Sequence, residues 1–189
     1  MFQGLEVPGP SWESSLLPSR VAKYAPEDLE QLCLAGETMW GRLAVSMEQT
    51  PGMRTRTQTR STPLGFFLRE NLHDIVRRPE GVNLTGVLSS RAREVLSFLE
   101  KKGASFLDDI SRTLGRLPAE AESALWELVG RGVVTGDGVA GLRTLLLPPV
   151  KRAGTRRAQS KMRGGAKRLT RQMPVGRWSL LGYSTLDIE

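Results

Sequence analysis

Apolar side chains recur at helical spacing through residues 88–134, and this stretch constrains the fold more than any other. Residues three and four apart share one face of a helix, so the pattern predicts three short helices. Their apolar positions are Ala92, Val95, Leu96 and Leu99, then Phe106, Leu107, Ile110 and Leu114, and then Ala121, Ala124, Leu125, Leu128 and Val129. Helices that each bury one stripe need one another, so we expect a small three-helix core.

The expected helix ends carry recognisable signals. Ser89 or Ser90 is predicted to cap the first helix and Ser105 the second. Pro118 suits the first turn of the third helix, because its missing N–H has no partner there. A glycine follows each helix, and the β-branched pair Val133-Val134 then begins a strand. A helix triplet followed by a strand pair is the layout of a winged helix, a helix-turn-helix variant.

Basic residues are concentrated in one acid-free segment, residues 138–186. It holds eleven bases, namely Arg143, Lys151, Arg152, Arg156, Arg157, Lys161, Arg163, Lys167, Arg168, Arg171 and Arg177. The chain has 27 Lys and Arg against 20 Asp and Glu, so without these eleven its charge is −4. Such a segment favours a polyanion, of which nucleic acid is the usual one. The alternative is a solvated, disordered tail.

Several classes of chemistry are excluded by composition. Cys33 and His73 are the only residues of their types, which rules out disulfides, His/Cys metal clusters and a Ser-His-Asp triad within the chain. No phosphate-binding loop occurs, and Asp108-Asp109 reads as a helix cap and a surface charge. We therefore expect no catalytic residue, no metal and no cofactor in this chain. With no secretory signal and no long apolar run, we expect a cytoplasmic protein without a membrane partner.

The whole chain is predicted to be α+β. We expect a helix at 26–34, strands at 37–46 and 63–69 that pair, and short helices at 71–78 and 139–147. Residues 177–181 are strand-like and could return to pair with 133–135, which would make the basic run an oversized wing. The expected parts are an extended N-terminal segment (1–25), a small α+β segment with a strand pair (26–87), a winged-helix-like domain (88–149 plus 175–182) and a basic mobile loop (150–174).

Three features are candidates for contact with nucleic acid. The third helix would enter the major groove in a helix-turn-helix, but its outer face carries Glu120, Glu122, Ser123 and Glu127, and carboxylates repel phosphates. We therefore expect it to pack on another module or to sit beside DNA. Trp126 on the same helix is more typical of a core or domain contact than of a ligand platform.

The second candidate is Trp40 with Arg42, which share one face of the strand at 37–46. An exposed Trp can stack on an unpaired base, and an Arg two residues away can bind phosphate. The alternative is a Trp packed under a neighbouring domain. The third candidate is the basic run together with Arg54, Arg56 and Arg60, whose signal is charge alone.

Several stretches resemble the C-terminal half of Lhr-type (large helicase-related) proteins, and the resemblance covers about residues 2–181. It is most specific at WGRL (40–43), ALWEL (124–128), VTGDG (134–138), GLR (141–143) and GRWS (176–179). Members of that family are ATP-dependent superfamily-2 helicases of the DEAD/DEAH-box type with a DNA-repair association. Their two motor domains precede a winged helix and further C-terminal domains that contact the tracking strand.

The resemblance implies strand guidance and DNA binding without ATP hydrolysis by these residues, since the chain has no motor. ATP and magnesium are then expected only in motor domains, which would be partners together with single-stranded or tailed DNA or an RNA–DNA hybrid. Two alternatives remain open. One is a glycosylase-like region that excises a damaged base, for which no aspartate here is matched to a site. The other is a protein-interaction module whose acidic third helix docks on a partner or on the motor.

Overall fold

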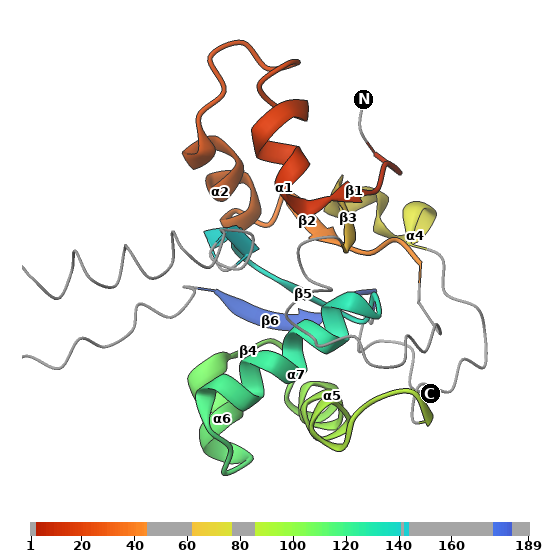
Figure 1. The fold of residues 1–189 in the computed structure, drawn as a ribbon, viewed down its shortest axis with the longest axis vertical. Helices are drawn as coiled ribbons and strands as arrows, with labels where there is room; N and C mark the ends of the chain where they lie inside the picture. The colour runs from red at the N-terminus through yellow and green to blue at the C-terminus, as the bar shows by residue number, and fades with distance from the viewer. Residues whose placement is uncertain (1–2, 45–61, 77–85, 141, 144–175, 183–189) are drawn as a thin grey trace, which may run out of the picture.

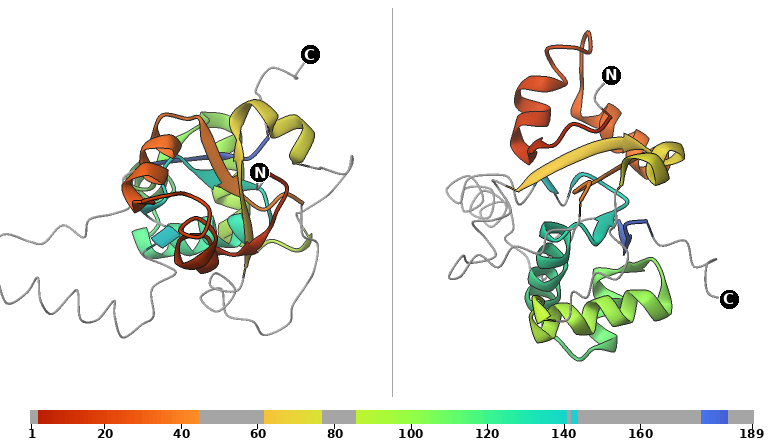
Figure 2. Two further views of the ribbon diagram at one scale, coloured as in Figure 1. Left: turned by 90° about the horizontal axis from the view of Figure 1, so that it is seen from above. Right: turned by 90° about the vertical axis from the view of Figure 1, so that its right-hand side faces the viewer.

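Two three-stranded antiparallel sheets lie between two groups of helices in the computed structural model (Figure 1). The structure describes residues 3–44, 62–76, 86–140, 142–143 and 176–182. The views agree that α1 and α2 cover one side of the paired sheets and that α5, α6 and α7 cover the other (Figure 2). The fold is therefore α+β, as predicted.

The first half of the chain builds one sheet and the helices above it. Its elements are β1 (Val7–Pro8), α1 (Gly9–Ser11), the π-helix η1 (Trp12–Leu16), α2 (Pro26–Leu34), β2 (Thr38–Gly41) and β3 (Pro63–Leu68). The strand order is β1-β3-β2, with Thr38 opposite Leu68 and Gly41 opposite Gly65. The predicted helix at 26–34 and the predicted strand pair are both confirmed.

The expectation of an extended N-terminal segment is wrong. Val7 and Pro8 pair with β3, and the residues after them turn into α1 and η1. Trp12 is the anchor, because its indole Nε1 donates to the Leu64 carbonyl at 2.7 Å and its ring meets Phe66 edge-on at 5.2 Å. Pro, Gly and Ser therefore shape tight local turns here around one fully buried aromatic residue.

After β3 the chain forms the 3-10 helix η2 (Arg69–Asn71) and α4 (Leu72–Ile75), the described part of the helix expected at 71–78. The second half then builds α5 (Ser90–Lys102), β4 (Ser105–Phe106), α6 (Leu107–Thr113), α7 (Pro118–Gly130), β5 (Val134–Gly136) and β6 (Arg177–Leu180). The three predicted helices are confirmed. Of the helix expected at 139–147, Ala140, Leu142 and Arg143 are helical, Val139 is a bend, and residues 141 and 144–147 lie outside the described residues.

The strand at the C-terminal end returns as predicted. Val134 lies opposite Leu180 and Thr135 opposite Ser179, and the sheet order is β4-β6-β5. Ser89 caps α5 by accepting from the Ala92 N–H at 3.2 Å. Ser105 does not cap α6, because it lies in β4 opposite Trp178 and its hydroxyl donates to the Gly103 carbonyl.

Both halves follow one plan, a strand, two helices and a hairpin whose last strand lies in the middle of the sheet. The second helix of each half begins in the same way, with a proline in its first turn at Pro26 and at Pro118. The backbone N–H before each proline donates to an acid three residues on, Ala25 to Asp28 at 3.1 Å and Leu117 to Glu120 at 3.3 Å.

These two helices also end in the same way. Gly36 and Gly132 adopt positive φ angles of 78° and 76°. The next N–H bonds back five residues in each case, Glu37 to the Leu32 carbonyl at 3.1 Å and Val133 to the Leu128 carbonyl at 3.0 Å. This is the glycine-terminated helix end in which the left-handed residue turns the chain away. A strand then begins two residues after each glycine.

The core runs through both halves. One cluster of buried residues extends from Trp12 to Trp178, and a smaller one joins Met39, Phe67 and Leu181. The halves meet where β2 packs against β5, and the Thr135 hydroxyl there donates to the Trp40 carbonyl at 2.6 Å. Strand β2 is therefore covered on both faces.

Candidate nucleic-acid interface

Trp40 lies inside the contact between the two halves. Its side chain is 1% exposed, and its indole Nε1 donates to the Gly138 carbonyl at 3.2 Å. The ring stacks on Trp126 with centroids 6.0 Å apart and meets Trp178 edge-on at 6.3 Å. The prediction of an exposed, base-stacking Trp40 is therefore wrong, and the alternative of a Trp packed beneath a neighbouring unit describes it.

Arg42 is engaged by the end of a helix. Its guanidinium Nη1 donates to the Gly130 carbonyl, the last residue of α7, at 3.0 Å. A cation at a helix C-terminus is favoured by the helix dipole and satisfies a carbonyl that has no partner within the helix. The guanidinium therefore joins β2 to α7, and the phosphate-binding role expected for Arg42 is not supported by this position.

Arg177, the first residue of β6, forms an exposed ion pair. Its Nε donates to Oδ2 of Asp137 at 2.9 Å, and the Asp137 N–H in turn donates to the Arg177 carbonyl at 2.9 Å. These contacts tie the two ends of the β5–β6 connection together. The remaining candidates lie outside the described residues, namely Arg54, Arg56, Arg60, Lys151, Arg152, Arg156, Arg157, Lys161, Arg163, Lys167, Arg168 and Arg171.

The carboxylates of α7 have structural partners. Glu127 accepts from both the N–H and the hydroxyl of Ser89, at 2.8 and 2.7 Å, and so closes the start of α5. Glu120 accepts from the Leu117 N–H and pairs with Arg91 of α5 at 2.9 Å. Trp126 is buried against Trp178, with ring centroids 5.2 Å apart. The outer face of α7 carries acidic side chains, as the sequence indicates. Trp126 of the same helix packs against other side chains of this chain.

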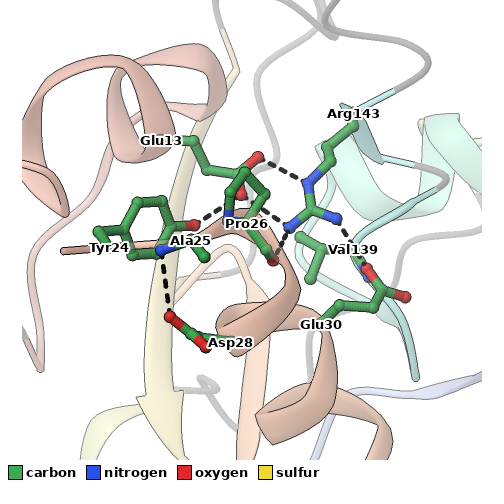
Figure 3. A network of polar contacts seen from close by, with 8 residues as sticks. All are labelled: Glu13, Tyr24, Ala25, Pro26, Asp28, Glu30, Val139 and Arg143. Atoms are coloured by element: carbon green, nitrogen blue, oxygen red, sulfur yellow. Dashed lines mark hydrogen bonds and ion pairs between the residues drawn. The ribbon is translucent and has the colours of Figure 1, made fainter.

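Arg143 is the centre of a polar network that sequence reasoning missed (Figure 3). Its Nε and Nη2 donate to the two carboxylate oxygens of Glu13 at 2.8 and 2.7 Å, and its Nη1 donates to Glu30 at 3.1 Å. Tyr24 donates its hydroxyl to Glu13 at 2.7 Å, and Glu30 also accepts from the Val139 N–H. One base of the acid-free segment is thereby committed to the fold.

The network perturbs the titration of its members. Burial opposes ionisation of Glu13, but hydrogen bonds from Arg143 and Tyr24 and the charge of Arg143 outweigh it and lower the pKa of Glu13. The hydrogen bond to Glu13 raises the pKa of Arg143. Burial, followed by the nearby charge of Glu30, raises the pKa of the Cys33 thiol to about 12, so this thiol stays protonated.

The described residues carry more acid than base, 16 Asp and Glu against 13 Lys and Arg. The excess positive charge therefore belongs to the rest of the sequence. Much of it falls in two connections, the one between β2 and β3 with Arg54, Arg56 and Arg60 and the one between β5 and β6. Each connection joins the two strands of a hairpin.

The described residues offer no group of three or more His, Cys, Asp and Glu side chains that could hold a metal ion. Within the same part of the chain, every helix is too short or too polar to cross a membrane.

Comparisons with known proteins bear on this architecture. A family model described as the winged-helix domain of large helicase-related proteins matches residues 1–56. This match falls on the first half of the chain, whereas the winged helix was predicted for the second. The described elements within the matched residues are β1, α1, η1, α2 and β2.

Two curated relatives align with nearly the whole chain. One is the "Lhr helicase/uracil glycosylase" of Escherichia coli strain K12, 28% identical over 200 residues. The other is the "Lhr helicase/ probable uracil glycosylase" of Mycolicibacterium smegmatis, 28% identical over 198 residues. Each alignment covers 97% of this chain and 12% of the relative, so the chain spans about an eighth of the length of the curated relatives it matches.

By these matches the chain is similar to Lhr helicases, and its residues 1–56 are similar to a winged-helix domain of large helicase-related proteins. The resemblance to Lhr-type helicases predicted from the residues is confirmed by the family model and by both relatives.

Proposed function

We propose that this chain is the nucleic-acid-binding part of the C-terminal region of an Lhr-type DNA helicase. In this proposal the chain holds or guides a DNA strand in repair and is not itself catalytic. The observation that carries the proposal is the separation of charge. An acidic folded body supports two hairpin connections that are rich in arginine and lysine. Phosphate contacts from such segments supply affinity without sequence specificity.

We infer that both halves are winged-helix units whose connections are their wings. The order of elements supports this for each half, and the second half also has the leading helix α5. The second helix of each unit is acidic in its first turn, with Glu27 and Asp28 in α2 and Glu120 in α7. These acids suit a helix N-terminus but repel phosphate, so the wings are better suited than the helices to contact DNA.

The two wings begin at opposite ends of the contact between the units. Trp40 of β2 bonds to Gly138, just beyond β5, whereas Arg42 bonds to Gly130, before β5 begins. Strands β2 and β5 therefore run in opposite directions. A DNA strand that touches both wings would cross the contact between β2 and β5. Phosphate contacts at two separated places then hold this DNA strand more firmly than contacts at one place.

Binding of a fluorescent oligo-dT across a salt series tests the proposal in the whole chain. Replacing Lys161, Arg163, Lys167 and Arg168 with Gln should weaken binding and make the slope of log affinity against log salt shallower by up to about 3. The matched control replaces four exposed bases of the body, Lys23, Arg93, Lys101 and Lys102, and should leave both nearly unchanged. Equal losses in the two variants, or no retention of the oligonucleotide at low salt, would refute the proposal.

Substrate form is tested with the same assay on single-stranded DNA, tailed duplex and an RNA–DNA hybrid. We propose that the motor domains of a helicase, with their ATP and magnesium, are the protein partner, and that the setting is the cytoplasm. The acidic-helix docking alternative gains no apolar contact from Trp126, because the neighbours of that side chain are Trp40 and Trp178 of this chain.

Base excision is a second candidate, favoured by the names of both relatives. It needs a flipped-base pocket and a carboxylate free to act. Of the partly buried carboxylates of the described body, Glu13 and Glu30 bind Arg143, Asp137 binds Arg177, and Glu6 accepts from the Leu43 N–H. Incubation of the chain with a uracil-containing strand, followed by alkaline cleavage, decides the matter, and an uncleaved strand excludes excision by this chain.

A further inference from the structure

The second helices of the two units differ in how much of their surface is buried. When Gly36 is matched with Gly132, Leu29 and Cys33 of α2 correspond to Leu125 and Val129 of α7. All four of these side chains are buried. Helix α2 thus packs on its own sheet through buried positions that match those α7 uses in its own unit.

A second face behaves differently. Leu32 of α2 corresponds to Leu128 of α7, yet Leu32 is 42% exposed whereas Leu128 is fully buried. The neighbouring Gln31 corresponds to Glu127, whose carboxylate caps α5 through Ser89. Helix α5 packs along α7 at this place. The described residues place no such helix on α2, and this absence accounts for the exposure of Leu32.

We propose that the face of α2 formed by Asp28, Gln31 and Leu32 is the docking site for an amphipathic helix of the larger Lhr-type polypeptide, seated as α5 is on α7. Chain geometry supports this occupant. Helix α5 leads into β4 within three residues through Gly103, which has a φ of 74°. Gly4, with a φ of 86°, lies three residues before β1, so a helix joined ahead of it would meet α2 in the same way.

Charge and length point to the same occupant. Glu27 and Asp28 are exposed at the start of α2, which begins about one turn later than α7 when Gly36 is matched with Gly132. At the start of α7, Glu120 pairs with Arg91 of α5. The docked helix should therefore carry an apolar stripe and a basic residue near its first turn. The chain spans 12% of the length of its relatives, so most of such a polypeptide lies outside the sequence described here.

The experiment supplies such a helix in cis. A copy of residues 89–102, which has the stripe and Arg91, is fused to the N-terminus of the full chain through a flexible Gly/Ser linker of about eight residues. Intramolecular attachment raises its effective concentration to the millimolar range. We expect the thermal midpoint to rise by about 4 °C or more, and Leu32→Gln in the host to abolish the gain.

Two controls separate docking from non-specific stabilisation. A fused segment with Val95, Leu96, Phe98 and Leu99 of the copy replaced by Gln should give no rise. Leu117→Gln, at the exposed leucine that immediately precedes α7, should leave the rise intact. The proposal is overturned if the fusion gives no rise, or if the rise survives Leu32→Gln. It is also overturned if sedimentation shows that the unfused chain is a dimer and that Leu32→Gln dissociates it, since the α2 face is then occupied by a second copy. None of these readouts depends on nucleic acid.

Discussion

Arg143 should stabilise the fold without binding nucleic acid, although the sequence counts it among the bases of the acid-free segment. Its side chain is 27% exposed, and its partners Glu13 and Glu30 are 23% and 20% exposed. Breaking a buried ion pair costs about 3–5 kcal/mol, whereas an exposed pair contributes at most about 1 kcal/mol. These side chains are about three-quarters buried, so Arg143→Gln should cost about 2–3 kcal/mol.

Urea and thermal denaturation measure this loss. In a chain of this size each kcal/mol moves the midpoint by about 2–4 °C, so a fall of about 4–12 °C is expected. Arg143→Lys should fall between Gln and the wild type, because an ammonium keeps the charge but cannot form the two-pronged contact with Glu13. The reasoning is refuted if Arg143→Gln moves the midpoint by less than 1 °C. It is equally refuted if the folded variant loses as much DNA affinity as the wing variant.

The remaining predictions concern the same network and the joint between the units. The pKa of Glu13 is lowered in the folded state. Its carboxylate therefore adds to the free energy of unfolding above the ordinary pKa of 4.5, and this contribution is lost as pH falls through the folded-state pKa. The stability difference between wild type and Glu13→Gln, measured in urea at pH 7 and then at successively lower pH, should therefore shrink below pH 4.5, and a constant difference would contradict this. A β-carbon on Gly132 would lie 2.7 Å from the Ala44 carbonyl oxygen, so Gly132→Ala should cost about 2 kcal/mol or more. Gly115→Ala is the control, because Gly115 also ends a helix with a positive φ but no atom lies within 4 Å of the added carbon, and equal losses would show that the Ala44 contact is unimportant.

Local signals predicted the helices well. Periodic apolar positions, a serine cap, prolines in first turns and glycines at helix ends are all read from neighbouring residues. The start of α2 at Pro26 and that of α7 at Pro118 were found in this way. Ser105 misled because a short strand, paired with β6, takes the place of the expected cap.

Long-range contacts were not accessible to the same reasoning. Alternation in β2 separates Met39 from Trp40 but does not say that both faces are covered. Met39 joins Phe67 and Leu181, while Trp40 joins the main core. Trp40, which the alternation predicts on the outward face of the strand, is therefore buried. The N-terminal segment was misjudged for the same reason, since Trp12 finds its partner 52 residues away.

The stretches that carry the family resemblance contribute to the joint between the units. Trp40, Trp126 and Trp178 come from three of them and surround one another there. Arg143 comes from a fourth and fastens the chain beyond β5 to α2 and η1. The stretches that resemble the family therefore indicate how the two units are held together. They do not indicate which residues contact DNA, and those candidates come from the distribution of charge instead.

Charge and packing divide the chain for a physical reason. An acid at a helix N-terminus stabilises that helix, as Glu120 and Asp28 do, and the same acid repels a phosphate backbone. A body built from such helices cannot also supply a cationic surface from those positions. In the proposed function, the bases that bind a polyanion come instead from the hairpin connections, such as the one that carries Lys161 and Arg163. Variants in the body should consequently change stability, variants in the connections should change affinity, and few should change both.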